Sequence, residues 1–157
     1  MRTIHVNEII RTVKEMCIEA NYYLTEDMEL ALGKAKSKER SELGKRILNQ
    51  LQENLEIASR EMIPICQDTG MTVVFARVGQ EVRIEGGSLT QAIHEGVRQG
   101  YEEGFLRKSV VRDPILRENT RDNTPAVIHY DIVEGDHIGI TVAPKGFGSE
   151  NMSRVFM

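Results

Sequence analysis

The sequence predicts a mixed α/β fold of the α+β class, with three or four helices packed on a largely antiparallel mixed sheet. Residues 1–63 carry apolar side chains at helical spacing, whereas short runs from residue 71 onward alternate between apolar and polar side chains, as strands do. Pro64 separates the two parts, and 157 residues are enough for one core. We therefore expect residues 1–157 to form a single domain, helical over residues 1–63 and built of sheet and helix over residues 71–157.

Two helices are expected near the N-terminus. Asn7 is suited to cap the first, because its side chain can accept a hydrogen bond from an unpaired N–H of the first turn. Cys17 falls on the apolar stripe of this helix, where it is expected to be a small core side chain. Thr25, followed by acidic residues, predicts the start of a second helix. We expect that helix to be short and to end near Gly33.

The third helix is the longest. It begins at Ser41, and one apolar stripe runs along it for about six turns. Pro64 lacks a backbone donor and disfavours helical geometry at the preceding residue, so the helix must end by Ile63. The stripe consists of Leu43, Ile47, Leu51, Leu55, Ala58 and Met62.

Four strands are expected after this helix. Residues 71–77 and 80–85 form the first two. Residues 126–133 and 137–143 alternate in the same way. The residues between them, 134–136, contain a glycine between two acidic side chains and predict a hairpin turn.

A fourth helix separates the two pairs of strands. Ser88 and Gln91 have the spacing of a capping box, and the apolar pattern continues to about Phe105. Glycine inside a helix costs about 1 kcal/mol relative to alanine, so three glycines on one face indicate close approach by another backbone. These are Gly96, Gly100 and Gly104.

Composition excludes several classes of protein. The net charge of −4 and the pI near 5.6 argue against a nucleic-acid-binding surface, which would be basic. No apolar run approaches the roughly 20 residues of a membrane-spanning helix, and the N-terminus lacks the apolar block of a signal peptide. Because the chain has only two cysteines, we expect a cytoplasmic protein with reduced thiols.

Candidate chemistry is concentrated in residues 66–70, which we call the thiol loop. A hydrophobic core does not need such a run of polar and sulfur side chains, whereas loops held between rigid elements commonly carry functional residues. The loop is therefore the primary candidate site. Its members are Cys66, Gln67, Asp68, Thr69 and Gly70.

Three functions are open for Cys66 from the residues alone. It can be a nucleophile paired with a histidine, a redox thiol, or a ligand of a metal or cluster. The sequence has no Cys-x-x-Cys pair to support the redox function, and spacing along the chain does not rank the other two. The histidines available as a base are His94, His129 and His137.

Asp68-Thr69-Gly70 is also the tripeptide of aspartic proteases. Those enzymes bring together two aspartates from two similar loops. Here the tripeptide occurs once and follows a long helical segment. The sequence therefore does not support a protease.

Taken together, four motifs resemble the α subunit of the iron–sulfur hydro-lyases, the family of class I fumarate hydratases and L(+)-tartrate dehydratases. The likeness runs from about residue 5 onward and depends on the order and spacing of the motifs. They are the thiol loop, Leu106-Arg107 after the helix with Gly96-Val97 and Tyr101, Asn123-Thr124-Pro125-Ala126, and Lys145-Gly146-Phe147-Gly148-Ser149-Glu150-Asn151.

The resemblance implies a [4Fe–4S] cluster held by three cysteines, with one iron open to substrate. Cys66 matches the first of these ligands. Gln67 and Asp68 match residues that contact substrate, and the match at Asp68 implies a part in proton handling. Arg107 matches an arginine that binds a substrate carboxylate, and Gly148 a glycine whose backbone lies against the substrate. The assignments are physically reasonable, because clusters need thiolates and a guanidinium binds a carboxylate at two points.

The implied reaction is reversible addition or removal of water on a small dicarboxylic acid, fumarate/malate first, with L(+)-tartrate as the alternative. In the family, the other two cluster cysteines lie beyond the position that matches Met157. We therefore expect the 157 residues to be the N-terminal part of an α subunit and inactive alone. The implied partner is a β subunit or C-terminal catalytic part, in a homo-oligomer or heterotetramer.

Two alternatives of other classes stay open. One is an enzyme with Cys66 as nucleophile, and the other is a non-catalytic domain whose thiol loop docks a partner chain. Arg107 also has a simpler explanation, as one solvated arginine among several in the charged segment 106–122. Asn123-Thr124-Pro125 is ordinary turn chemistry, and we expect it to be scaffold.

Overall fold

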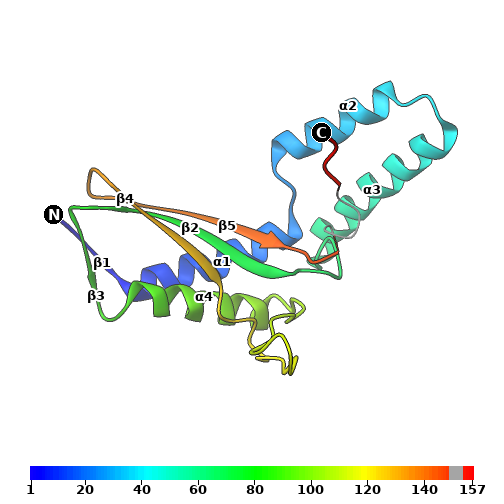
Figure 1. Ribbon diagram of the computed structural model, residues 1–157. Coiled ribbons are helices and arrows are strands. Elements are labelled where there is room, and N and C mark those ends of the chain that lie inside the picture. Colours follow the sequence, from blue (N-terminus) through cyan, green and yellow to red (C-terminus); the bar gives the residue numbers. More distant parts are fainter. Residues whose placement is uncertain (149–153) are drawn as a thin grey trace.

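A computed structural model describes residues 1–148 and 154–157 of the chain (Figure 1). The described residues form helices together with parallel and antiparallel strands, which confirms the predicted α+β class. The helices are α1 (Val6–Tyr22), α2 (Glu26–Lys38), α3 (Glu42–Glu61) and α4 (Leu89–Glu103). The strands are β1 (Arg2–His5), β2 (Met71–Gly79), β3 (Val82–Glu85), β4 (Val127–Val133) and β5 (Ile138–Lys145).

The strand β2 is the centre of a three-stranded sheet in the order β4-β2-β5. It pairs in parallel with β4 and antiparallel with β5, and β1 pairs in parallel with β3 in a separate two-stranded sheet. Antiparallel pairing therefore accounts for one of these three strand pairs and does not predominate as expected. The hairpin predicted through residues 134–136 is wrong, because β4 and β5 lie on opposite edges of β2. Alternation predicts strands but does not say which strands pair.

The N-terminal helices differ from their predicted bounds. The strand β1 was not predicted, and α1 is capped by His5, whose Nδ1 accepts a hydrogen bond from the N–H of Asn7 at 3.2 Å. Helix α2 continues through Gly33 to Lys38 instead of ending at the glycine. Gly33 is exposed, so only its modest intrinsic cost opposes the helix there.

The two longer predicted helices are confirmed, with one correction. Ser41 caps α3, its Oγ accepting from the N–H of Gly44 at 3.3 Å. Helix α3 ends at Glu61, before Pro64, as predicted. Ser88 precedes α4, but its side chain makes no capping hydrogen bond, so the predicted capping box with Gln91 does not form.

The core lies between the three-stranded sheet and helices α1 and α4, which run side by side in Figure 1. A Cβ at Gly96 would lie 2.8 Å from the carbonyl oxygen of Ile10. A Cβ at Gly100 would lie 2.8 Å from the Cβ of Cys17. The predicted close approach at the helical glycines is therefore confirmed, and Cys17 is fully buried as expected. The other large apolar side chains that are fully buried in the described part of the chain are Val13, Val74, Ile93, Val97 and Tyr101.

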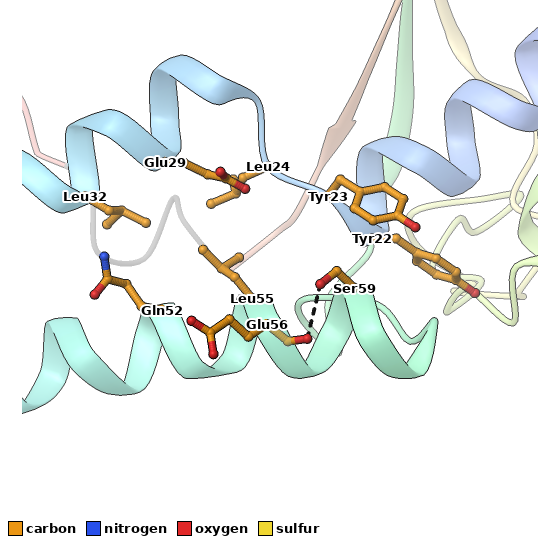
Figure 2. Close-up of a pocket in the computed structure, with 9 residues that line it drawn as sticks. All are labelled: Tyr22, Tyr23, Leu24, Glu29, Leu32, Gln52, Leu55, Glu56 and Ser59. Carbon is orange, nitrogen blue, oxygen red and sulfur yellow. Dashed lines mark hydrogen bonds between the residues drawn. The ribbon is translucent and has the colours of Figure 1, made fainter.

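Helices α2 and α3 form an arm that extends away from the sheet (Figure 1). No residue of α2 is buried, and Ala58 is the buried residue of α3. A cavity of about 270 Å³ lies between α2, α3 and the end of α1, and its lining includes Tyr22, Tyr23, Leu32 and Leu55 (Figure 2). No helix in the described part of the chain is long and apolar enough to cross a membrane.

We expect Gly100→Ala to lower the free energy of unfolding by about 1–3 kcal/mol, because the added Cβ has no room against α1. The matched control is Gly33→Ala, where no atom lies within 4 Å of the added Cβ. This control should raise the free energy of unfolding by roughly 0.5–1 kcal/mol. Urea unfolding measures both variants. A Gly100→Ala chain as stable as the wild type contradicts the close packing of α1 and α4.

Candidate functional site

The thiol loop is positioned by the end of α3. Met62 ends the helix in the left-handed region, with φ 54°, and turns the chain back toward α1. Ile65 is then held at both of its backbone groups. Its N–H donates to the carbonyl of Asn21 at 2.8 Å, and its carbonyl accepts from Nδ2 of Asn54 at 2.9 Å. Helices α1 and α3 therefore hold the backbone immediately before Cys66.

The two cysteines have opposite environments. Cys66 is a free, exposed thiol whose Sγ accepts a hydrogen bond from the N–H of Asp68 at 3.4 Å. Cys17 is fully buried, and burial raises the pKa of its thiol to about 12. A thiol that stays protonated and inaccessible is a poor nucleophile and a poor metal ligand. Cys66 is the thiol available for chemistry.

The carboxylate of Asp68 is held by the loop that follows β5. Its Oδ2 accepts from the N–H of Phe147 at 2.8 Å and from that of Gly148 at 3.1 Å. The N–H of Gly148 is the largest cause that lowers the pKa of Asp68, followed by the N–H groups of Phe147 and Gly70 and the charge of Arg107. These causes outweigh the opposing effect of partial burial. Asp68 is therefore a carboxylate at neutral pH.

The guanidinium of Arg107 reaches the same loop from the chain after α4. Its Nη1 donates to Oε1 of Gln67 at 2.9 Å. The carbonyl of Arg107 accepts from Oγ1 of Thr69 at 3.0 Å. Side chain and backbone of Arg107 thus both bind the thiol loop, while the side chain is also exposed to solvent.

The structure brings all five predicted site residues together at the thiol loop, in two hydrogen-bonded groups that the backbone of the loop connects. Cys66 is bonded to Asp68, Asp68 to Gly148, and Gln67 to Arg107. The role of each residue stays a prediction. The last members of the fourth motif, Ser149, Glu150 and Asn151, lie outside the described residues.

The sequence analysis did not identify the buried residues whose side chains donate hydrogen bonds to backbone carbonyls of the thiol loop. The hydroxyl of Tyr101, a core residue of α4, donates to the carbonyl of Thr69 at 2.8 Å. Asn123, expected to be a turn residue, is fully buried and donates from Nδ2 to the carbonyl of Gly70 at 3.1 Å. A usable signal was the tyrosine itself, because a buried phenol needs a hydrogen-bond partner.

The structure gives no support to a pairing of Cys66 with a histidine. Each of the three candidate rings makes its described contact elsewhere, on the sheet or on the segment leading into it. Burial lowers the pKa of His94, so this partly buried ring is neutral at pH 7. The contacts are His94 Nδ1 with the N–H of Ala126 at 3.2 Å, His129 stacked on Phe75 at 5.0 Å, and His137 Nδ1 with Asp136 at 2.6 Å.

Cys66 is suited to be one cysteine ligand of an iron–sulfur cluster. Iron–sulfur clusters are held by thiolates, and Cys66 is an accessible thiol in a polar loop. Cys17 does not fit, because it is sealed between α1 and α4. In residues 1–148 and 154–157, no group of three or more His, Cys, Asp or Glu side chains could hold a metal ion.

We expect one thiol to react in the folded chain. A maleimide at neutral pH should label Cys66 and leave Cys17 unlabelled, because Cys17 is buried and its pKa is near 12. Mass spectrometry of the labelled peptides measures this, with the urea-unfolded chain as the control in which both cysteines react. Cys66→Ser should take up no label while folded. Labelling of Cys17 at a rate comparable to Cys66 contradicts the burial described.

We also expect stability to fall at high pH. Burial raises the pKa of Cys17 from 9.0 and that of Tyr101 from 10.0, each to about 12. The unfolded chain therefore releases these protons first, so the free energy of unfolding is unaffected below about pH 9 and falls between about pH 9 and 12. The slope is at most about 1.4 kcal/mol per pH unit for each group. Measured by urea unfolding, Cys17→Ala should not show the decrease in the free energy of unfolding that begins near pH 9 in the wild type. A flat wild-type profile contradicts this expectation.

Known proteins resemble this chain along most of its length. The family model for fumarate hydratase (Fumerase) matches residues 10–157. A putative L(+)-tartrate dehydratase subunit alpha of Methanocaldococcus jannaschii is 40% identical over 156 residues, which cover 96% of this chain and 54% of the relative. The anaerobic class I fumarate hydratase of Escherichia coli is 35% identical over 120 residues, or 75% of this chain and 22% of that enzyme.

A putative class I fumarate hydratase of Geobacillus stearothermophilus is 28% identical over 152 residues, which cover 93% of this chain and 29% of the relative. The chain thus spans about half, or less, of the length of these relatives. The family model nevertheless matches almost the whole of this chain, from residue 10 to residue 157. It identifies the same family that the order of the four sequence motifs indicates. This chain belongs to the fumarate hydratase (Fumerase) family.

Proposed function

We propose that the chain is part of a hydro-lyase that reversibly adds water to, or removes it from, a small dicarboxylic acid. Family membership supports the reaction class. The observation that carries the proposal is the convergence of an exposed thiol, a carboxylate and a guanidinium on one loop, through the bonds of Cys66, Asp68 and Arg107. A dicarboxylate reaction needs this combination of a cationic anchor and a group that can hold a proton.

Cys66 would provide one thiolate ligand of a [4Fe–4S] cluster, and the remaining ligands would come from other parts of the assembled enzyme. When bound, the cluster would supply Lewis-acid chemistry at a substrate oxygen. The Sγ of Cys66 is exposed and accepts a hydrogen bond from the backbone N–H of Asp68. Its position next to Gln67 and Asp68 would keep substrate-binding side chains beside the ligand.

Arg107 would bind one carboxylate of the substrate. A guanidinium has five N–H donors in a planar fork, so the bond from Nη1 to Gln67 leaves donors for a carboxylate. Gln67 would orient the guanidinium, and its own amide N–H₂ group would be directed to a substrate oxygen. Because Arg107 and Gln67 are both exposed, a ligand can reach them without displacing the core.

Asp68 would hold the proton that moves between the substrate carbon and the enzyme. Its Oδ2 is engaged by the N–H groups of Phe147 and Gly148. The backbone of Gly148 is also the group that the resemblance places against the substrate. A substrate oxygen that accepts from Gly148 would therefore take this donor from Asp68 and leave a carboxylate oxygen better able to accept a proton. In this way Gly148 would couple substrate binding to the basicity of Asp68.

Fumarate/malate is the first candidate substrate, and L(+)-tartrate is the alternative. Relatives carry both names, the tartrate dehydratase subunit at 40% identity and the fumarate hydratase at 35%. Assaying the assembled enzyme with both acids decides between them. The name of the M. jannaschii relative, a subunit alpha, supports a partner subunit for this chain. Two free thiols support a reducing compartment, the cytoplasm.

In the assembled enzyme, we expect Cys66→Ala to abolish cluster incorporation and, with it, hydro-lyase activity, because the remaining thiolates would not hold the cluster. Iron and sulfide analysis measures incorporation, and hydration of fumarate or dehydration of L(+)-tartrate measures activity. Cys17→Ala is the matched control and should keep the wild-type iron content. A Cys66→Ala enzyme with full iron content and activity refutes the ligand assignment.

A further inference from the structure

Asn123 joins the two segments that carry the proposed substrate-binding groups. Its side chain is fully buried. The Oδ1 atom accepts from the N–H of Ser109 at 2.7 Å and from that of Val110 at 3.1 Å. The Nδ2 atom donates to the carbonyl of Gly70 at 3.1 Å. One amide thus ties the chain just after Arg107 to the end of the thiol loop.

The backbone at Asn123 is held in the conformation that this bridge requires. Its φ is 61°, in the left-handed region, where asparagine is tolerated better than most side chains. The turn after it is closed by Asp122, whose Oδ1 accepts from the N–H of Thr124 at 3.0 Å and from its hydroxyl at 2.9 Å. Burying a primary amide is unfavourable unless its polar atoms form hydrogen bonds, and here three backbone groups bind the oxygen and the nitrogen.

The bridge holds the backbone from which Arg107 extends. Arg107 is exposed, so packing does not hold its side chain. Its own carbonyl is bound by Thr69, and the residues two and three positions later are bound by Asn123. Both connections end on the thiol loop. The bond from Arg107 to Gln67 therefore depends on backbone that Asn123 and Thr69 keep at a set distance.

We propose that Asn123 is a positioning residue, which sets the Arg107 guanidinium beside the thiol loop through the backbone of Ser109, Val110 and Gly70. This proposal rests on the proposed function for its kinetic consequence, and it has a geometric consequence that does not depend on activity. Loss of the amide should let the guanidinium move away from Gln67, the neighbour of Cys66 in the chain, while the sheet and α4 stay folded.

The test uses Asn123→Gly, because glycine keeps the positive φ and removes only the amide. The matched control is Asn119→Gly in the same segment. Asn119 is exposed, its Nδ2 donates to the carbonyl of Lys108 at 2.8 Å, and its Oδ1 accepts from the N–H of Arg121 at 2.6 Å. This control therefore removes similar bonds that do not reach the thiol loop. Arg107→Ala defines the result expected when the guanidinium is absent.

The first measurement is the alkylation of Cys66 in the iron-free assembled enzyme, by iodoacetate and by the neutral iodoacetamide, followed by mass spectrometry of the Cys66 peptide. A nearby guanidinium favours the anionic reagent. We expect Arg107→Ala and Asn123→Gly to lower the ratio of the two rates, by about two- to sixfold, which is the effect of one unit charge roughly 4–10 Å away in water. Asn119→Gly should keep the wild-type ratio.

The second measurement is steady-state kinetics of the iron-loaded enzyme. We expect Asn123→Gly to raise KM for the dicarboxylate about tenfold with an unchanged iron content per chain. A purely structural role would instead lower the iron content or the stability and leave the constants per loaded site unchanged, and this result overturns the proposal. An inactive wild-type enzyme refutes the proposed function, while the rate ratio still decides the role of Asn123.

Two further outcomes also overturn the proposal. One is a wild-type rate ratio in Asn123→Gly when Arg107→Ala lowers it. The other is an unchanged ratio in Arg107→Ala itself, since the guanidinium would then not lie at the thiol. Should Asn123→Gly not fold, Asn123→Ser, which keeps a hydroxyl acceptor, takes its place. If both variants are unfolded, Asn123 supports the fold as a whole and positions nothing in particular.

Discussion

The site depends on the approach of two backbones at Gly70. The φ of Gly70 is 63°, and a Cβ there would overlap the carbonyl of Lys145 at the end of β5. Only glycine can occupy this position. The contact seats the thiol loop on the end of β5, and the chain that leaves β5 turns back so that the N–H groups of Phe147 and Gly148 reach Asp68. The pairing of β2 with β5 brings the two distant loops together, and the missing side chain of Gly70 permits their close approach.

Buried and exposed side chains have different functions in this site. Tyr101 and Asn123 are buried and bind backbone carbonyls of the thiol loop, where low polarity and complete hydrogen bonding make such bonds rigid. Cys66, Gln67 and Arg107 are exposed above them. Backbone is therefore held from the core side, while the side chains that would meet a ligand remain open to solvent. Pre-organised backbone with accessible side chains is what a binding site requires.

Much of the local structure could be predicted because it depends on neighbouring residues. Ser41 and Pro64 bound α3 through a cap and a missing donor, and the helical glycines revealed the crossing of α1 and α4 through their missing side chains. Strand pairing could not be predicted. Residues of β4 and β5 alternate as a hairpin would, yet both pair with β2, because the segment between them passes the end of β2, where the N–H groups of Gly79 and Glu81 donate to carbonyls of that segment. The end of α2 was also wrong, since one exposed glycine does not stop a helix.

The sequence by itself determined the composition of the candidate site. Cys66, Gln67 and Asp68 are adjacent in the chain, and the order of the four motifs pointed to the family that comparison with known proteins supports. Only the tertiary structure decided how Arg107 and Gly148 meet that loop, and that Asn123 belongs beneath it instead of in a surface turn. The physical reason is that residues up to 80 positions apart are joined by single hydrogen bonds, whose geometry depends on the sheet and on α4 and leaves no local pattern.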